Sequence, residues 1–200
     1  MTLPSALFTI PNLLSLLRIG LAPLFLAAAY VGNRPLFLVL FAAALLTDAL
    51  DGFVARRLDQ TTALGTRLDS WGDCAVYSVT PLALWWLWPE QILREAPAVA
   101  TAVAAFLLPL LLGFAKYKKL TSYHTHGAKL AAVLLAVTTP LLVLGGPAWP
   151  FRLAVLVLAL AELEEIAITL TLPVHCDNVP SLGAARRLRA KLPPTPEEKP

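Results

Sequence analysis

Five of the six aspartates in this chain lie in one short stretch, from Thr47 to Asp73, and four of these five are spaced three or four residues from another. On helices, residues three or four apart share a face, so the stretch contains two pairs of neighbouring carboxylates. Converging carboxylates repel one another and stay ionised only with cations among them. Aspartates without histidine or cysteine suit hard divalent ions such as Mg²⁺ or Mn²⁺, and two such ions form a clamp for phosphoryl displacement. The stretch therefore predicts a metal site formed by Asp48, Asp51, Asp69 and Asp73.

Small and basic residues lie between these acids. Gly52 and Gly65 carry no side chain where a substrate would approach the backbone, and the short side chain of Ala55 leaves space on the same helix face. Arg56 offers a planar fork of donors suited to phosphate. Solvated charges in a loop are the simpler interpretation of any one aspartate, but clustered acids with these companions favour a phosphate-handling site.

The elements that position these residues are predicted to be membrane helices. Hydrophobic residues make up 58% of the 200-residue chain and charged residues only 14%, against about 25% charged in soluble domains. Lipid is therefore the expected solvent. The net charge of +3 does not indicate nucleic-acid binding, because the basic residues lie between apolar runs. We predict an all-α integral membrane protein with six transmembrane helices, at 13–31, 36–54, 71–88, 99–115, 129–144 and 151–172.

The chain is divided accordingly into three parts. Residues 1–12 are predicted as a short interfacial helix with Asn12 as the N-cap of the first span. Residues 13–172 are predicted as the six-helix domain. Residues 173–200 are predicted as a basic, proline-rich cytoplasmic tail that is partly disordered. Six spans put both termini on one side, which holds 13 of the 16 Lys and Arg residues and is therefore expected to face the cytoplasm.

The aspartate stretch resembles the signature of the CDP-alcohol phosphotransferases. The pattern Asp48-x2-Asp51-Gly52-x2-Ala55-Arg56-x8-Gly65-x3-Asp69-x3-Asp73 matches it at all eight fixed positions. The segment Pro11-Asn12-Leu13-Leu14-Ser15, followed by Arg18, is similar to the start of the first span in that family. Past Asp73 the likeness is mostly one of topology.

The resemblance implies a role for each matched residue. It places a first metal ion on Asp48, Asp51 and Asp69, and a second on Asp48, Asp69 and Asp73, with Asp73 also the general base. The CDP moiety is expected on the remaining residues of the two motifs, together with Thr62 in the link: Asn12, Ser15, Gly52, Ala55, Arg56, Thr62 and Gly65.

The activity implied by the resemblance is transfer of a phosphatidyl group from CDP-diacylglycerol to an alcohol, with release of CMP. The expected cofactor is Mg²⁺ or Mn²⁺, as two ions, at the cytoplasmic surface of a multi-pass membrane protein. Acceptors used within the family include glycerol 3-phosphate, serine, inositol phosphate, choline and phosphatidylglycerol, and glycerol 3-phosphate is favoured here. Homodimers occur in the family, but nothing in this sequence indicates one.

A second polar cluster lies between the fourth and fifth predicted spans. Lys118, Lys119 and Lys129 could bind an anionic acceptor, although the excess of positive charge on cytoplasmic loops also explains them. His124 and His126 are interpreted as loop residues. Three acids in the last span, Glu162, Glu164 and Glu165, have either a functional or a structural role, which the sequence leaves open.

Two rival functions use similar residues. Membrane prenyltransferases bind diphosphate through two separated Asp-rich motifs on a longer chain, which leaves Ala55, Arg56 and Gly65 without a role here. A cation transporter would spread acids through the membrane depth, whereas these aspartates lie at one end of their spans. Only the glutamates of the last span favour the transporter.

Overall fold

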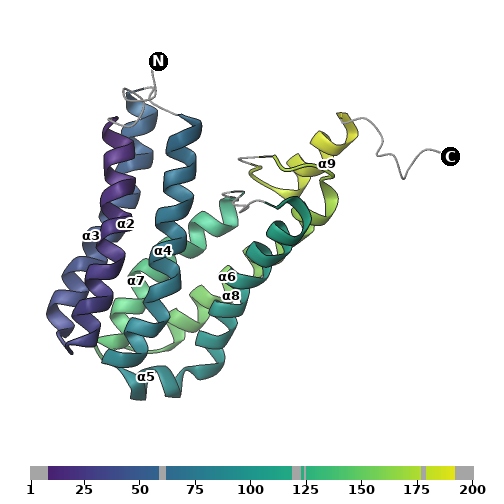
Figure 1. Cartoon of the computed structure of the whole chain (residues 1–200). Coiled ribbons are helices and arrows are strands. Elements are labelled where there is room, and N and C mark those ends of the chain that lie inside the picture. The colour runs from purple at the N-terminus through teal and green to yellow at the C-terminus, as the bar shows by residue number, and fades with distance from the viewer. Residues whose placement is uncertain (1–8, 59–61, 119–122, 124, 177–178, 192–200) are drawn as a thin grey trace. The chain divides into compact units, whose positions relative to one another are not determined.

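The computed structural model describes residues 9–58, 62–118, 123, 125–176 and 179–191. The chain forms two compact units, Met1–Leu93 and Arg94–Pro200, and each is described by itself. Figure 1 shows both as helical, and the described residues contain no strand. The all-α prediction is thus confirmed.

The first unit contains helices α2 (Ile10–Tyr30), α3 (Arg34–Arg57) and α4 (Ala63–Leu87), followed by the short α5 (Pro89–Arg94). Helix α2 packs along both α3 and α4, while α3 and α4 contact each other much less (Figure 1). A side chain on α2 can therefore reach residues of both neighbours, which matters for the site described below.

Aromatic packing holds this unit together near the turn between α2 and α3. The ring of Phe25 meets those of Phe37 and Phe41 edge-on, at centroid distances of 5.7 and 6.3 Å. Arg34 ties the start of α3 to the end of α4, because its Nε donates to the carbonyl of Leu87 at 2.9 Å. In the turn between α2 and α3, Gly32 has a φ of +73°, which glycine adopts without steric cost.

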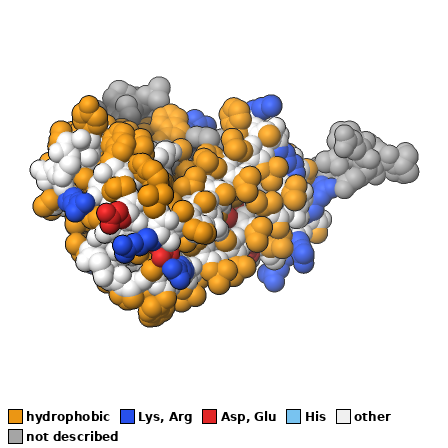
Figure 2. Space-filling model, turned by 90° about the horizontal axis from the view of Figure 1, so that it is seen from below, with side chains coloured by type: hydrophobic (Ala, Val, Ile, Leu, Met, Phe, Trp, Pro, Cys, Tyr) orange, Lys and Arg blue, Asp and Glu red, His pale blue; other side chains and the backbone are white. Residues whose placement is uncertain are grey.

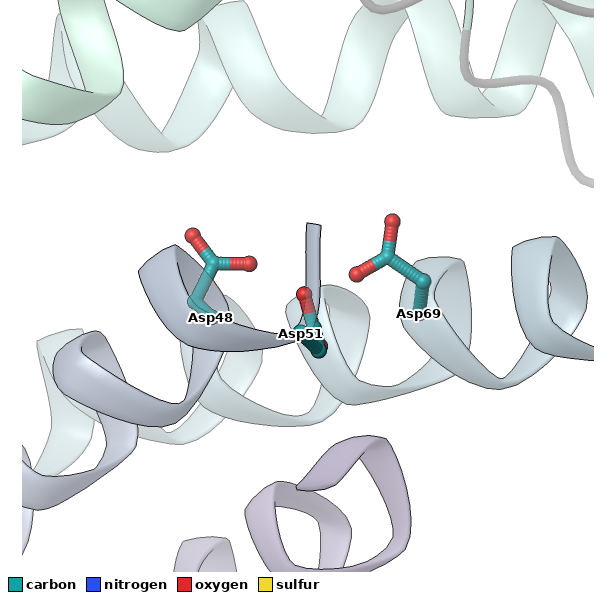
Figure 3. Close-up of side chains that lie close together, drawn as sticks. All are labelled: Asp48, Asp51 and Asp69. Atoms are coloured by element: carbon teal, nitrogen blue, oxygen red, sulfur yellow. The ribbon is translucent and has the colours of Figure 1, made fainter. Parts of the chain in front are cut away.

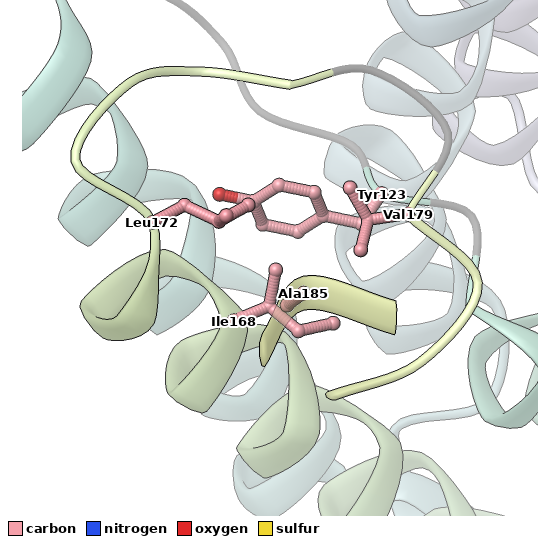
Figure 4. Packing of buried hydrophobic residues seen from close by; sticks show 5 residues of the cluster. All are labelled: Tyr123, Ile168, Leu172, Val179 and Ala185. Atoms are coloured by element: carbon pink, nitrogen blue, oxygen red, sulfur yellow. The ribbon is translucent and has the colours of Figure 1, made fainter. Parts of the chain in front are cut away.

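The second unit contains α6 (Ala96–Tyr117), α7 (His126–Val143), α8 (Trp149–Thr171) and α9 (Leu182–Lys191). Helix α8 packs against the other three. Its beginning is fixed by Arg152, whose guanidinium donates two hydrogen bonds of 2.7 Å to the carboxylate of Glu95. Near its end, a cluster of buried side chains joins α8 to α9 and to the link before α7 (Figure 4): Tyr123, Ile168, Leu172, Val179 and Ala185.

Four of the described helices are long and apolar enough to cross a membrane: Ile10–Tyr30, Arg34–Val54, Ala96–Tyr117 and His126–Val143. Hydrophobic side chains cover much of the surface seen in Figure 2, and many leucines are exposed, as expected where lipid is the solvent. These four match predicted spans. The other two predicted spans correspond to α4 and α8, which carry several charged residues, and their crossing of the membrane stays a prediction.

Two sequence-based expectations differ from the structure. Asn12 is not an N-cap: α2 begins at Ile10 with Thr9 as its N-cap, so Asn12 is a buried residue of the first helical turn. The proposed interfacial helix at the N-terminus lies almost entirely outside the described residues. In the tail, Leu182–Lys191 is helical. This helix forms because Ala185 is buried against α8 and because α8 supplies a hydrogen-bond acceptor for its first residue, Leu182.

Candidate active site

The aspartates are carried by the end of α3 and the beginning of α4. Asp48 and Asp51 lie in the last turns of α3, and Asp69 and Asp73 lie in the first turns of α4. Thr62 starts α4 as its N-cap, because its hydroxyl accepts the backbone N–H of Gly65 at 2.9 Å. Since α3 ends at Arg57 and α4 begins at Ala63, the two pairs of acids are held at the same end of the unit.

Three of the carboxylates lie close together. Asp48, Asp51 and Asp69 each offer an oxygen within 4.8 Å of the others, and Figure 3 shows them grouped between α3 and α4. Asp73 belongs to the same site through a shared neighbour, since the Nη1 of Arg18 is 2.8 Å from both Asp73 and Asp48. The predicted convergence of all four acids is therefore present in the structure.

Arg18 lies at the centre of the site, on α2. Besides those two contacts, its Nη1 is 3.1 Å from Asp69, and its Nη2 contacts Asp51. The side chain of Arg18 is almost fully buried. Sequence reasoning named Arg18 only as part of the family-like first span and gave it no role. Its position in an apolar helix was the available signal, since a charged residue there requires a partner.

The donor set fits a hard divalent cation. It consists of carboxylate oxygens, with neither histidine nor cysteine among the grouped acids, which is the ligand chemistry that Mg²⁺ and Mn²⁺ prefer. The same oxygens already surround a buried cationic group, the guanidinium of Arg18. The site is therefore built for positive charge, and Asp48, Asp51 and Asp69 could hold one metal ion.

The residues expected near the nucleotide fall into two groups. The hydroxyl of Ser15 is 3.2 Å from both the carboxylate of Asp51 and the carbonyl of Pro11, so it supports an acid of the site. Asn12, Thr62 and Gly65 lie together: a Cβ on Gly65 would be 2.8 Å from the Oδ1 of Asn12 and 3.1 Å from the Oγ1 of Thr62. A larger residue at this position would force the side-chain amide of Asn12 to shift.

The remaining predicted site residues are placed less fully. Gly52 is half-buried in α3, next to Asp51. Ala55 and Arg56 belong to α3, but their side chains lie outside the described part of the chain, as does Lys119. Lys118 ends α6 in the left-handed conformation, with a φ of 57°, and Lys129 lies in the first turn of α7. Both lysines are exposed and belong to the second unit.

A small pocket adjoins the carboxylates, lined by residues of α2, α3 and α4. Arg18, Asp48 and Asp73 supply its polar walls, and Tyr77 lies one turn beyond Asp73 on α4. The rest of its lining is apolar: Ala44, Leu45 and Val76. Asp48 and Asp73 therefore belong to the carboxylate site and also line a partly apolar pocket.

Two of the three glutamates of the last predicted span, Glu164 and Glu165, have structural partners. Glu164 accepts the backbone N–H of Leu182 at 2.9 Å and so caps α9. Glu165 is buried and accepts hydrogen bonds from the backbone of Tyr123 and from the backbone and hydroxyl of Thr125. For these two acids the structural interpretation, which the sequence left open, is the one that the contacts support.

The chain resembles known proteins over most of its length. The CDP-alcohol phosphatidyltransferase family matches residues 8–172. Cardiolipin synthase (CMP-forming) of Rattus norvegicus is 45% identical over 78 residues, which cover 38% of this chain and 26% of that protein. The CDP-diacylglycerol–glycerol-3-phosphate 3-phosphatidyltransferases of Pectobacterium atrosepticum and Pseudomonas fluorescens are 38% and 32% identical over 89 and 111 residues.

These matches differ in extent. The two bacterial alignments cover 40% and 50% of this chain and 49% and 57% of the relatives, so the matched part spans from about a quarter to just over half of these curated proteins. No solved structure matches the chain. The family match covers the first unit with all four aspartates and continues to the end of α8. This protein therefore belongs to the CDP-alcohol phosphatidyltransferase family.

Proposed function

We propose that the protein transfers a phosphatidyl group from CDP-diacylglycerol to an alcohol and releases CMP. The observation that carries the proposal is the convergence of four aspartates at one end of α3 and α4. The three acids assigned to the first metal ion by the resemblance are those with oxygens within 4.8 Å of one another. Membership of the family supports the same donor.

The chain's own residues have separable roles in this proposal. Asp48, Asp51 and Asp69 hold one divalent ion, and Asp48, Asp69 and Asp73 hold a second. Bound ions of this kind supply charge stabilisation to the attacking and leaving oxygens of a phosphoryl displacement. Asp73 accepts the proton of the acceptor hydroxyl. The new bond joins that oxygen to the β-phosphorus, the bond from the β-phosphorus to the bridging oxygen breaks, and CMP leaves.

Residues around the acids would hold the nucleotide and the acceptor. Gly52, Gly65 and Arg56 are proposed to contact the CDP moiety, with Arg56 on the diphosphate. Lys118, Lys119 and Lys129 are proposed to attract an anionic acceptor. The site is proposed to face the cytoplasm, because most basic residues flank that end of the spans.

Glycerol 3-phosphate is the proposed acceptor. Two of the relatives are named for this acceptor, and an anionic substrate suits the lysines between α6 and α7. A second candidate is phosphatidylglycerol, with cardiolipin as the product, because 78 residues of this chain are 45% identical to a cardiolipin synthase.

The test is CMP release by the purified protein from CDP-diacylglycerol, with Mg²⁺ or Mn²⁺ and a panel of acceptors. We expect release that requires the metal and is much faster with one acceptor than with the others. Asp73→Asn is the matched control, since it keeps the shape of the side chain but cannot accept the proton. If folded protein releases no CMP with any acceptor, and liposomes show a cation flux that Asp73→Asn abolishes, the transporter is the better explanation.

A further inference from the structure

Arg18 is a buried cation that contacts every carboxylate of the proposed metal site. Its Nη1 lies 2.8 Å from Asp48, 2.8 Å from Asp73 and 3.1 Å from Asp69, and its Nη2 contacts Asp51. The residue is 1% exposed. One guanidinium therefore holds together acids that come from two helices, α3 and α4, which barely touch each other.

These contacts use oxygens that a metal ion would also need. Asp48, Asp51 and Asp69 are the acids with oxygens within 4.8 Å of one another, and each of them also contacts Arg18. A guanidinium and a divalent ion placed among the same carboxylates would repel each other at short range, where charges interact strongly. The two cations therefore compete for the same oxygens.

The packing around Arg18 leaves room for its side chain, but one of its hydrogen-bond donors, the Nε, has no partner among the described residues. The backbone of α4 passes close to it at Gly72, where a Cβ would lie 3.3 Å from its Cδ and 3.5 Å from its Nη1. The Nε is also buried. The guanidinium of an arginine can donate five hydrogen bonds. Arg18 contacts the four carboxylates only through its two terminal nitrogens, so the attraction between opposite charges is what mainly holds its side chain.

We propose that Arg18 is an internal counter-ion that holds the four carboxylates together until divalent metal binds, and that gives up contacts to the metal when it does. The inference rests on the proposed function, because it requires the metal site. Arg18 by itself supplies a charge of +1 to the four carboxylates that it contacts, so a divalent ion would bring them more positive charge than Arg18 does. Metal affinity is thereby lowered, while the metal-free protein is stabilised.

The test compares Arg18→Gln with the wild type in two conditions. Thermal unfolding is measured in detergent with EDTA and with Mg²⁺, and Mn²⁺ binding is measured by electron paramagnetic resonance. In EDTA we expect Arg18→Gln to lower the unfolding temperature by about 5 °C. Mg²⁺ should restore more than half of that loss, and Mn²⁺ should bind about tenfold more tightly than to the wild type, within the usual range of coupling between ligands.

The matched control is Arg67→Gln, which removes an exposed arginine from α4 two residues before Asp69. It should change neither quantity beyond a small screened effect. An equal loss of stability in EDTA and Mg²⁺, with unchanged Mn²⁺ affinity, would show that Arg18 only packs the helices and would overturn the inference. If the wild type itself bound no Mn²⁺ and gained no stability from Mg²⁺, the proposed metal site would fail first, and the inference with it.

Arg18→Lys keeps the test decisive should Arg18→Gln fail to fold. An ammonium is a compact charge that cannot span four carboxylates as a planar guanidinium does. This variant should therefore also bind Mn²⁺ more tightly than the wild type, by a smaller factor. Unchanged affinity in a folded Arg18→Lys protein would count against the inference.

Discussion

Both units of the protein contain grouped acids, but the two groups are neutralised in different ways. In the first unit, four aspartates share one guanidinium, that of Arg18. In the second unit, Glu164 and Glu165 accept hydrogen bonds from backbone N–H groups and a hydroxyl. The four aspartates therefore share a single charged partner in Arg18, whereas each of these two glutamates has hydrogen-bond donors of its own.

This difference separates an acid kept for function from an acid kept for structure. Carboxylates with too few positive partners destabilise a fold, and such destabilisation is typical of sites that bind a ligand or catalyse a reaction. Carboxylates that accept local N–H groups stabilise the segments that carry those groups. Intramembrane acids are functional candidates by default, and the partners that surround them decide which interpretation holds.

The largest effect is expected at Asp48, which should matter for activity and little for stability. Asp48→Asn removes a proposed ligand of both metal ions, and we expect CMP release to fall on the order of 10³-fold, equivalent to about 4 kcal/mol of transition-state stabilisation. The side chain of Asp48 is 43% exposed, and it contacts Arg18 in company with three other carboxylates. The unfolding temperature in EDTA should therefore change little, because the lost contact with Arg18 is offset by weaker repulsion among the remaining acids. A variant that lost both stability and activity would contradict the distinction.

The next effect is expected at Glu165, with the opposite pattern. Glu165→Ala leaves the donors of Tyr123 and Thr125 without their acceptor, which should cost about 1–3 kcal/mol of unfolding free energy. CMP release per folded molecule should stay near the wild-type value. Glu165→Gln retains a carbonyl oxygen as acceptor and should lose less than half as much stability. Should the Gln variant be folded but inactive, Glu165 would have to be regarded as a site residue.

A smaller, local effect is expected at Glu164. Glu164→Ala removes the acceptor of the Leu182 N–H and should weaken α9 by about 1 kcal/mol, as loss of a helix cap does. Tryptic cleavage after Arg186 and Arg187 in α9 should become several-fold faster, because local opening exposes the backbone. The Glu164→Gln protein should resemble the wild type. Unchanged cleavage in Glu164→Ala would mean that α9 is held by Ala185 and its apolar neighbours alone.

The smallest effect is a pH dependence at Glu95, before α6. The hydrogen bonds from Arg152 lower the pKa of Glu95 below its ordinary value of 4.5. The ionised pair therefore adds stability that is fully present above pH 4.5 and is lost as the pH falls through the lowered pKa. The effect is small because Arg152 is 62% exposed. Unfolding temperatures of wild type and Glu95→Gln should differ by a constant amount above pH 5 and converge in acid.

Much of the first unit could be predicted from the sequence. The spacing of Asp48, Asp51, Asp69 and Asp73 placed each pair on one helix face, because helical periodicity is a local property. The short link between the two apolar runs placed the pairs at the same end. Composition predicted the membrane, and four of the described helices meet its requirements of length and apolarity. The resemblance to the family rests on the same residues.

Other features depended on tertiary contacts. Helical periodicity cannot predict that α2 packs against both α3 and α4, and this packing makes Arg18, distant in the chain, the shared partner of four aspartates. Likewise, Glu164 and Glu165 have adjacent positions on α8 but cap different segments, since their donors lie in separate parts of the chain. The sequence by itself determined which acids lie on a common helix face and that they belong to a membrane protein. Only the tertiary structure decided which of them meet a cation and which meet a backbone N–H, because those partners come from elements far away in the sequence.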